Sequence, residues 1–193
     1  MEDSMTMWRF MILFLFTLIP ACQSAYINGV PNEGSLYFQV PVDSKLILNR
    51  TITIEPFQNS AYFQRGRMIP WYEVIKYGAY CALAVERKRD VEQAVKPGEF
   101  VVHNVSNESF FSIAKAGKRN LVPVAFKLPV ADTKDGNGSY EVYATVMELR
   151  SDTQTEVRRL TCADWGLPQG MQTLTVEIIR QSLGDFFSLK LAR

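Results

Sequence analysis

The chain has 193 residues, of which 47% are hydrophobic and 21% are charged, and its formal net charge is +1 at pH 7. This length suits one domain with a sizeable core. The near-neutral charge gives no long-range reason to expect nucleic acid or an anionic membrane surface as a partner.

The chain begins with a short apolar run, residues 10–19. A bilayer-spanning helix needs about 20 apolar residues, so this run is too short to span and fits the core of a signal peptide. Glu2 and Asp3 stand where a positive region is usual, and a start at Met5 or Met7 would restore that pattern. We expect residues 1–21 to be a signal peptide.

The run ends in Ile19-Pro20-Ala21-Cys22. This stretch resembles the lipobox of bacterial lipoproteins, in which a peptidase cuts before a cysteine whose thiol carries diacylglycerol. Ile19 and Ala21 suit the pattern, whereas Pro20 departs from it, because Ala or Ser is usual there. The resemblance covers only the signal region, and it implies that Cys22 is lipidated and begins the mature chain.

The same resemblance bears on location. In enteric-type bacteria an Asp after the lipidated cysteine resembles an inner-membrane retention signal, and this chain has Gln23 instead. That implies an outer-membrane lipoprotein whose domain faces the periplasm. The alternative is a secreted protein cut before Ala25, at a small-x-small site.

Three cysteines are an odd number for an exported protein. Removal of Cys22 by lipidation leaves Cys81 and Cys162 as an even pair in an oxidising compartment, and we expect them to form a disulfide. Closing so long a loop stabilises a fold by about 4–5 kcal/mol on the chain-entropy model.

Residues 22–35 are rich in Asn, Gly, Ser and Pro and lack periodicity, which indicates a tether between the anchor and the domain. We expect residues 36–193 to form a single globular domain.

The domain is mostly a series of short strands. In residues 45–56, Ile52 and Ile54 alternate with polar neighbours, as in a half-buried strand. In residues 79–88 the same alternation places Cys81 on the face of Leu83 and Val85. Further strand-like stretches, rich in β-branched and aromatic residues, are 36–42, 60–69, 99–105, 109–115, 121–130, 139–149 and 156–165. The pattern predicts a mainly β fold, either an antiparallel sandwich or a partly open barrel.

Helix signals are few. Residues 89–95 could form one or two turns before Pro97-Gly98. The clearest helix is near the end of the chain, where Thr175 can cap it, Val176, Ile179 and Leu183 form an apolar stripe, and Gly184 stops it. Residues 185–193 then predict a last strand with Phe187, Leu189 and Leu191 on one face.

Little in the sequence supports catalysis or metal binding. The single histidine, His103, lies in a predicted strand, and no G-x-S-x-G motif is present, so a hydrolase triad is not predicted. Residues 131–141 look like a calcium loop, but neither glycine register supplies the required carboxylates, and "DGNG" indicates a hairpin turn. We predict no catalytic residue, no metal and no cofactor. An envelope hydrolase remains the alternative, using paired carboxylates such as Glu73, Glu86 or Asp164.

Residues 62–80 combine six aromatic side chains with Arg65, Arg67 and Lys76. Aromatic faces and arginine forks suit sugar rings, peptidoglycan peptides or a protein partner. The predicted binding patch is Arg65, Arg67, Trp71 and Tyr72. The alternative is two strands with an aromatic core, and we expect Trp71 to be buried and both arginines to be exposed.

Two further patterns concern structure and modification. Trp165, three residues after Cys162, suggests an aromatic ring packed against the disulfide. Four N-x-S/T sequons, at Asn49, Asn104, Asn107 and Asn137, support a eukaryotic secreted glycoprotein as a rival. The leading hypothesis is a lipid-anchored envelope protein with a non-catalytic binding or scaffolding role and an unknown protein or glycan partner.

Overall fold

The computed structural model describes residues 26–27, 30–35, 37–75, 78–112, 140–166 and 174–192. The expected mainly β fold is confirmed, with a short helix near the end of the chain followed by a final strand. The signal region and Cys22 lie outside the described residues, as do residues 121–130, the "DGNG" turn and the side chain of Trp165.

The elements in chain order are β1 (Tyr26–Ile27), β2 (Val30–Pro31), β3 (Lys45–Leu48), β4 (Ile52–Ile54), β5 (Ser60–Gln64), β6 (Arg67–Ile69), η1 (Trp71–Glu73), β7 (Tyr80–Val85), β8 (Gln93–Val95), β9 (Gly98–Ser112), β10 (Tyr140–Arg150), β11 (Val157–Gly166), α2 (Val176–Leu183), η2 (Gly184–Phe186) and β12 (Phe187–Lys190).

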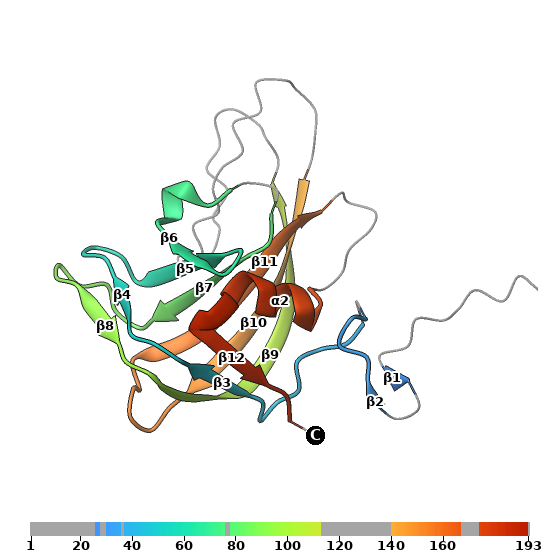
Figure 1. The fold of residues 1–193 in the computed structure, drawn as a ribbon. Coiled ribbons are helices and arrows are strands. Elements are labelled where there is room, and N and C mark those ends of the chain that lie inside the picture. Colours follow the sequence, from blue (N-terminus) through green and yellow to red (C-terminus); the bar gives the residue numbers. More distant parts are fainter. Residues whose placement is uncertain are drawn as a thin grey trace, which may run out of the picture.

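Eight strands form one antiparallel sheet, in the order β12-β3-β9-β10-β11-β7-β5-β6. The sheet curls into an open half-barrel, and α2 lies against its concave side (Figure 1). The partly open barrel is therefore the correct alternative of the two that the strand pattern predicts. The stretches 99–105 and 109–115, expected as two strands, belong in their described part to one long strand, β9.

The main core fills the concave side of the sheet. Phe63 and Phe100 are fully buried there, and Phe63 packs edge-on against Phe187 with ring centroids 5.2 Å apart. The helix contributes Val176, Ile179 and Leu183 to the same cluster, as its apolar stripe predicts. Burying this stripe holds a helix of eight residues that would be marginal alone in water.

The ends of α2 follow the sequence signals. The Oγ1 atom of Thr175 accepts a hydrogen bond from the backbone N–H of Ile178 at 3.3 Å, which caps the helix. Gly184 ends it with a φ of 55°, a left-handed conformation that glycine adopts without steric cost.

A second apolar cluster covers part of the opposite face of the sheet. The alternation along β7 is as predicted: Cys81, Leu83 and Val85 face the main core, while Tyr80 and Ala82 belong to the second cluster. Both faces of β7 are buried, so its sequence is apolar throughout. The cluster consists of Tyr62, Val74, Tyr80, Ala82, Val142, Ala144 and Ala163, with Ile69 and Trp71 packed against it.

The two cysteines of the domain face each other across neighbouring strands. Cys162 of β11 is directly opposite Cys81 of β7, and their sulfur atoms lie 2.08 Å apart, a disulfide distance. Both residues are fully buried in the main core. The predicted pair is thus brought together at the centre of the sheet.

Two local predictions are wrong. Residues 93–95 form strand β8, not helix, because they pair with β4 and bury Val95 in the core. Residues 37–44 contain no strand, although Phe38 and Val40 are buried and Tyr37 is exposed as their alternation suggests. Burial of alternate side chains holds this segment against the core without a strand ladder.

The described part of the expected tether contains backbone pairing between β1 and β2. Farther along, Glu33 forms an ion pair with Arg180 of α2, and Ser35 is buried. Contacts of the segment with the domain therefore begin before residue 36. None of the helices in these described ranges is long and apolar enough to cross a membrane.

Candidate binding site

The predicted patch residues lie on the β5–β6 hairpin and on the turn that follows it. Arg65 and Gly66 form the two-residue turn with φ values of 53° and 72°, as a type I′ hairpin requires. Arg65 and Arg67 are both exposed, as expected. The backbone N–H of Gly66 donates a hydrogen bond to the Ser182 carbonyl at 3.1 Å, which fixes the hairpin against the end of α2.

The two aromatic patch residues lie on η1, beyond the hairpin. Trp71 is half-buried and packs against the second cluster, so the expectation of burial holds for only part of its side chain. Tyr72 is 67% exposed, and its ring meets the Trp71 ring edge-on with centroids 6.5 Å apart. The patch is therefore divided between the arginine turn and this aromatic pair.

A buried glutamine holds the segment after η1. Gln64 is 4% exposed, and its Nε2 group donates hydrogen bonds to the carbonyls of Ile75 and Gly78 at 3.1 and 3.2 Å. Its Oε1 atom accepts from the backbone N–H of Ile75 at 2.9 Å. A side chain that satisfies both donors and acceptors of a loop fixes the loop's path, because leaving these groups buried and unpaired is costly.

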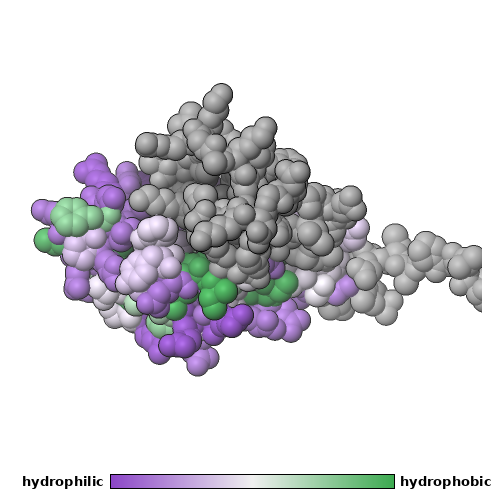
Figure 2. Space-filling model, turned by 90° about the horizontal axis from the view of Figure 1, so that it is seen from above, coloured by the Kyte–Doolittle hydropathy of each residue, from purple (hydrophilic) through white to green (hydrophobic). Residues whose placement is uncertain are grey.

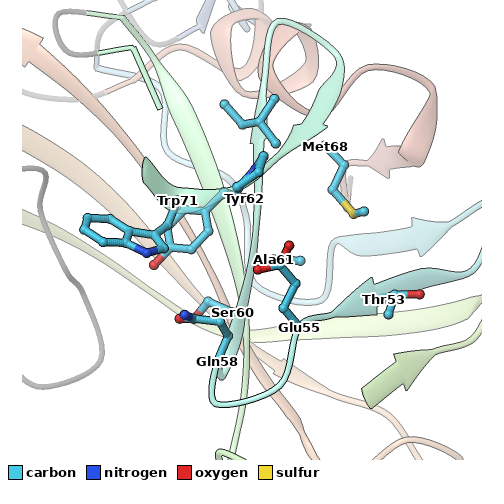
Figure 3. A pocket seen from close by; sticks show the side chains of 10 residues that line it. Thr53, Glu55, Gln58, Ser60, Ala61, Tyr62, Met68 and Trp71 are labelled. Atoms are coloured by element: carbon cyan, nitrogen blue, oxygen red, sulfur yellow. The ribbon is translucent and has the colours of Figure 1, made fainter. Parts of the chain in front are cut away.

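A small notch is lined by residues of β4, β5, β6 and η1 and of the turn between β4 and β5 (Figure 3). Trp71 and Tyr62 line one side, and Met68 and Thr53 lie on the other. Its volume is about 100 Å³, well below the roughly 300–1,000 Å³ of sites for drug-sized ligands. The notch therefore suits one ring or one side chain. Its lining residues are Thr53, Glu55, Gln58, Ser60, Ala61, Tyr62, Met68, Ile69, Pro70 and Trp71.

Burial changes the acid–base behaviour of one lining residue. Desolvation raises the pKa of Tyr62, and a hydrogen bond with Ser60 opposes this rise. The Tyr62 hydroxyl therefore stays protonated throughout the neutral range. The side chain of Tyr62 therefore lines the notch as an uncharged aromatic ring.

The turn between β4 and β5 frames the notch. Glu55-Pro56-Phe57-Gln58 is a β-turn in which the Gln58 N–H donates to the Glu55 carbonyl at 3.1 Å. Phe57 has a φ of 61°, at the position where a type II turn favours glycine. It is nevertheless a large side chain and 63% exposed. Backbone strain of this kind is concentrated at functional sites in proteins.

Glu55 and Gln58, the first and last residues of this turn, line the notch and have side chains available for a ligand. Across the described residues, the Glu55 carboxylate forms no ion pair and the Gln58 carboxamide no hydrogen bond. Glu55 is also the single charged residue among the described ones that line the notch. The "EPFQ" stretch could have been noticed in the sequence as a Pro-x turn with a bulky residue in the glycine position.

Exposed apolar side chains surround the notch and η1. Met68 is 40% exposed and Ile75 is 51% exposed, in addition to Tyr72. Seen from above, hydrophobic residues lie in small groups among hydrophilic ones, at the left end of the described surface and beside the grey atoms (Figure 2). We call Met68, Trp71, Tyr72 and Ile75 the η1 surface.

The candidate catalytic groups are placed on separate elements. His103 lies at an irregularity of β9, exposed, with its Nε2 atom 3.8 Å from a carboxylate oxygen of Glu148. Glu86 follows β7 and pairs with Arg158 at 2.7 Å, Glu73 is exposed on η1, and Asp164 lies on β11. Within the described ranges, no group of three His, Cys, Asp or Glu residues could hold a metal ion.

The sequon asparagines differ in their surroundings. Asn104 is exposed on β9. The Nδ2 group of Asn49 donates to the Asp185 carbonyl and to the Ser188 hydroxyl, both at 3.1 Å. Asn107 accepts a hydrogen bond from Thr145 at 3.1 Å, and Asn137 lies outside the described residues.

No protein-family model matches the chain, and no match was found among the curated proteins or the solved structures.

Proposed function

We propose that the protein is an exported, lipid-anchored protein of the bacterial cell envelope that acts by binding a partner and not by catalysis. The resemblance of residues 19–22 to a lipobox supports export and the anchor. The sulfur distance between Cys81 and Cys162 adds to this support, because it accounts for two of the three cysteines and Cys22 is the third. Gln23 supports the outer membrane as its location, with the domain facing the periplasm.

The observation that carries the binding role is the η1 surface on a fixed framework. Exposed aromatic and apolar side chains lie together there, and Gln64 fixes the loop that displays them. Large exposed aromatic residues are typical of binding hot spots, since they lose little conformational entropy when they are covered.

Hydrolysis is less well supported than binding. A glycosidase needs two carboxyl groups, roughly 5 to 10 Å apart. The notch offers Glu55 as the one carboxylate among its described lining residues. Glu86, one of the acids considered for this role, is engaged by Arg158.

The anchor is tested by mass spectrometry of the protein purified from expressing cells. We expect a mature N-terminus at Cys22 with the mass of a diacylglyceryl group. Cys22→Ala should leave the protein in the soluble fraction. An unmodified chain beginning at Ala25 would contradict the anchor and indicate a secreted protein.

The binding role is tested by photo-cross-linking in intact cells. A photoreactive amino acid at position 72 should give one major adduct, whose identity mass spectrometry then reveals. The same amino acid at Tyr37 is the matched control, because Tyr37 is 62% exposed and lies outside the η1 surface. Equal adduct patterns at both positions, or none at position 72, would contradict a partner at η1.

A further inference from the structure

The hydrogen-bonding groups of the notch are of mixed kind. Glu55 offers only acceptors, whereas the Gln58 carboxamide and the Thr53 hydroxyl offer both donors and acceptors. A ligand that matches them must itself carry donors and acceptors around one small ring or chain. An ammonium group carries donors alone, so it would leave the Gln58 donors unmatched.

The aromatic wall gives a second requirement. Trp71 is only half-buried and forms part of the notch, so some of its indole is open to a ligand. The face of an indole carries excess negative charge density and attracts the slightly positive C–H edge of a neighbouring group. The ligand therefore has one apolar C–H face in addition to its polar rim.

The charge of the notch gives a third requirement. Glu55 is negative, and no basic side chain is among the described lining residues; neither Arg65 nor Arg67 reaches the lining. A phosphate or carboxylate on the ligand would therefore be repelled. The charge therefore excludes an anionic ligand, and together with the mixed hydrogen-bonding groups it favours a neutral one.

From these three requirements we propose that the notch binds one ring of a neutral saccharide, with its C–H face on Trp71 and its hydroxyl groups on Glu55 and Gln58. A pyranose has a C–H face and a rim of hydroxyl groups, each of which donates and accepts. The small volume admits a single ring of a longer glycan. This inference rests on the proposed binding role and gives the chemical class of one partner.

An extended peptide added to the edge of the sheet is less well supported. β6 is the edge strand but has only three residues, with Arg67 at its start and Pro70 directly after it. Short length, charge and proline are the features that protect edge strands from pairing with other chains. A peptide is therefore an outcome for the experiment to separate from a sugar.

The test is saturation-transfer NMR with the protein as it is purified from expressing cells. The probes are glucose, N-acetylglucosamine, the disaccharide chitobiose, glucose 6-phosphate and a peptide of alternating Val and Thr. We expect saturation of ring protons for at least one neutral sugar and a weaker signal for glucose 6-phosphate than for glucose. No signal from any of the neutral sugars, or a signal from the peptide alone, would overturn the proposal.

Variants locate the binding. Trp71→Ala should weaken sugar affinity at least tenfold. The double variant Glu55→Ala/Gln58→Ala should do the same, and it is safe for folding because these side chains form no bonds with the described residues. Tyr37→Ala should leave the affinity unchanged. Sugar binding that survives the double variant would place the sugar elsewhere and overturn the assignment.

The two proposals fail in different ways. A major adduct on a protein at position 72, with no sugar signal, would keep the binding role and remove the saccharide. A sugar signal that depends on Trp71, from a protein found soluble and unlipidated, would keep the saccharide site and remove the anchor.

Discussion

Gly66 and Gly184 are in direct backbone contact: a Cβ atom on Gly184 would lie 2.3 Å from the Cα of Gly66. Gly66 is in the turn of the β5–β6 hairpin, and Gly184 ends α2. Both residues have positive φ, so both the space and the backbone favour glycine. This contact sets the position of the hairpin that forms one side of the notch.

Gly184→Ala should therefore destabilise the fold. Forcing an atom into this contact costs about 1–3 kcal/mol, and the left-handed backbone adds about 1–2 kcal/mol. Urea unfolding measures the loss. Gly34→Ala is the matched control, because the nearest atom to its added Cβ is 3.7 Å away. Equal unfolding midpoints for the two variants would contradict the close contact.

Phe57→Gly tests whether the turn beside the notch is strained. Glycine removes a left-handed cost of about 1–2 kcal/mol and introduces an entropic cost of about 0.5–1 kcal/mol. We expect a protein that unfolds at the same or slightly higher urea concentration than the wild type. Phe57→Ala keeps the strain and serves as the control, which should be the less stable of the two. The reverse order would mean that the positive φ at this position costs less than the backbone entropy that glycine adds.

Stability should fall in alkaline solution because of Tyr80. Burial, and after it the nearby Tyr62, raises the pKa of Tyr80 well above its ordinary value. An unfolded tyrosine ionises at about pH 10, so above that pH the folded state holds a proton that the unfolded state has lost. The contribution of Tyr80 to the free energy of unfolding is thus fully present below about pH 10 and is lost as the pH rises further.

The measurement is the urea midpoint between pH 8 and pH 11. Tyr80→Phe should flatten the decline of the midpoint above pH 10, because it removes the hydroxyl whose pKa is raised. Tyr72→Phe, at an exposed tyrosine, should leave the wild-type slope unchanged. Equal slopes in all three proteins would assign the alkaline loss to other groups.

The cysteine pair should contribute strongly to stability. The residues are 81 positions apart, and a loop of that length gives about 4–5 kcal/mol on the chain-entropy model. We expect Cys81→Ala/Cys162→Ala to unfold at much lower urea concentration than the oxidised wild type. Non-reducing peptide mapping should show the two peptides joined. Two free thiols in protein purified under oxidising conditions would contradict the bond.

Local sequence patterns predicted well where one interaction dominates. Thr175 and Gly184 bound α2 as capping chemistry requires, and its apolar stripe is buried in the main core as predicted. The pairing of Cys81 with Cys162 followed from the odd number of cysteines together with the lipobox resemblance at Cys22. In each case the residues that form the interaction are the same residues that make up the sequence pattern.

Tertiary contacts decided the features that the sequence did not predict. Residues 93–95 have helix-forming neighbours, yet pairing with β4 makes them a strand. The notch joins Glu55 and Gln58 to Trp71 from segments separated by the whole of β5 and β6. No local pattern marks such a meeting, and the aromatic-rich stretch 62–80 pointed to only one side of it.

The position of β12 has a consequence for the order of folding. This strand, formed by residues 187–190, pairs with β3 near the start of the domain, and Asn49 bonds to Ser188 across 139 residues of sequence. Until those residues are available, β3 has an open edge and the main core lacks α2. Contacts so distant in sequence form slowly. A chain crossing a membrane from its N-terminus would therefore complete its core only after nearly all of it had emerged, and until then its apolar face would be open to chaperones and proteases.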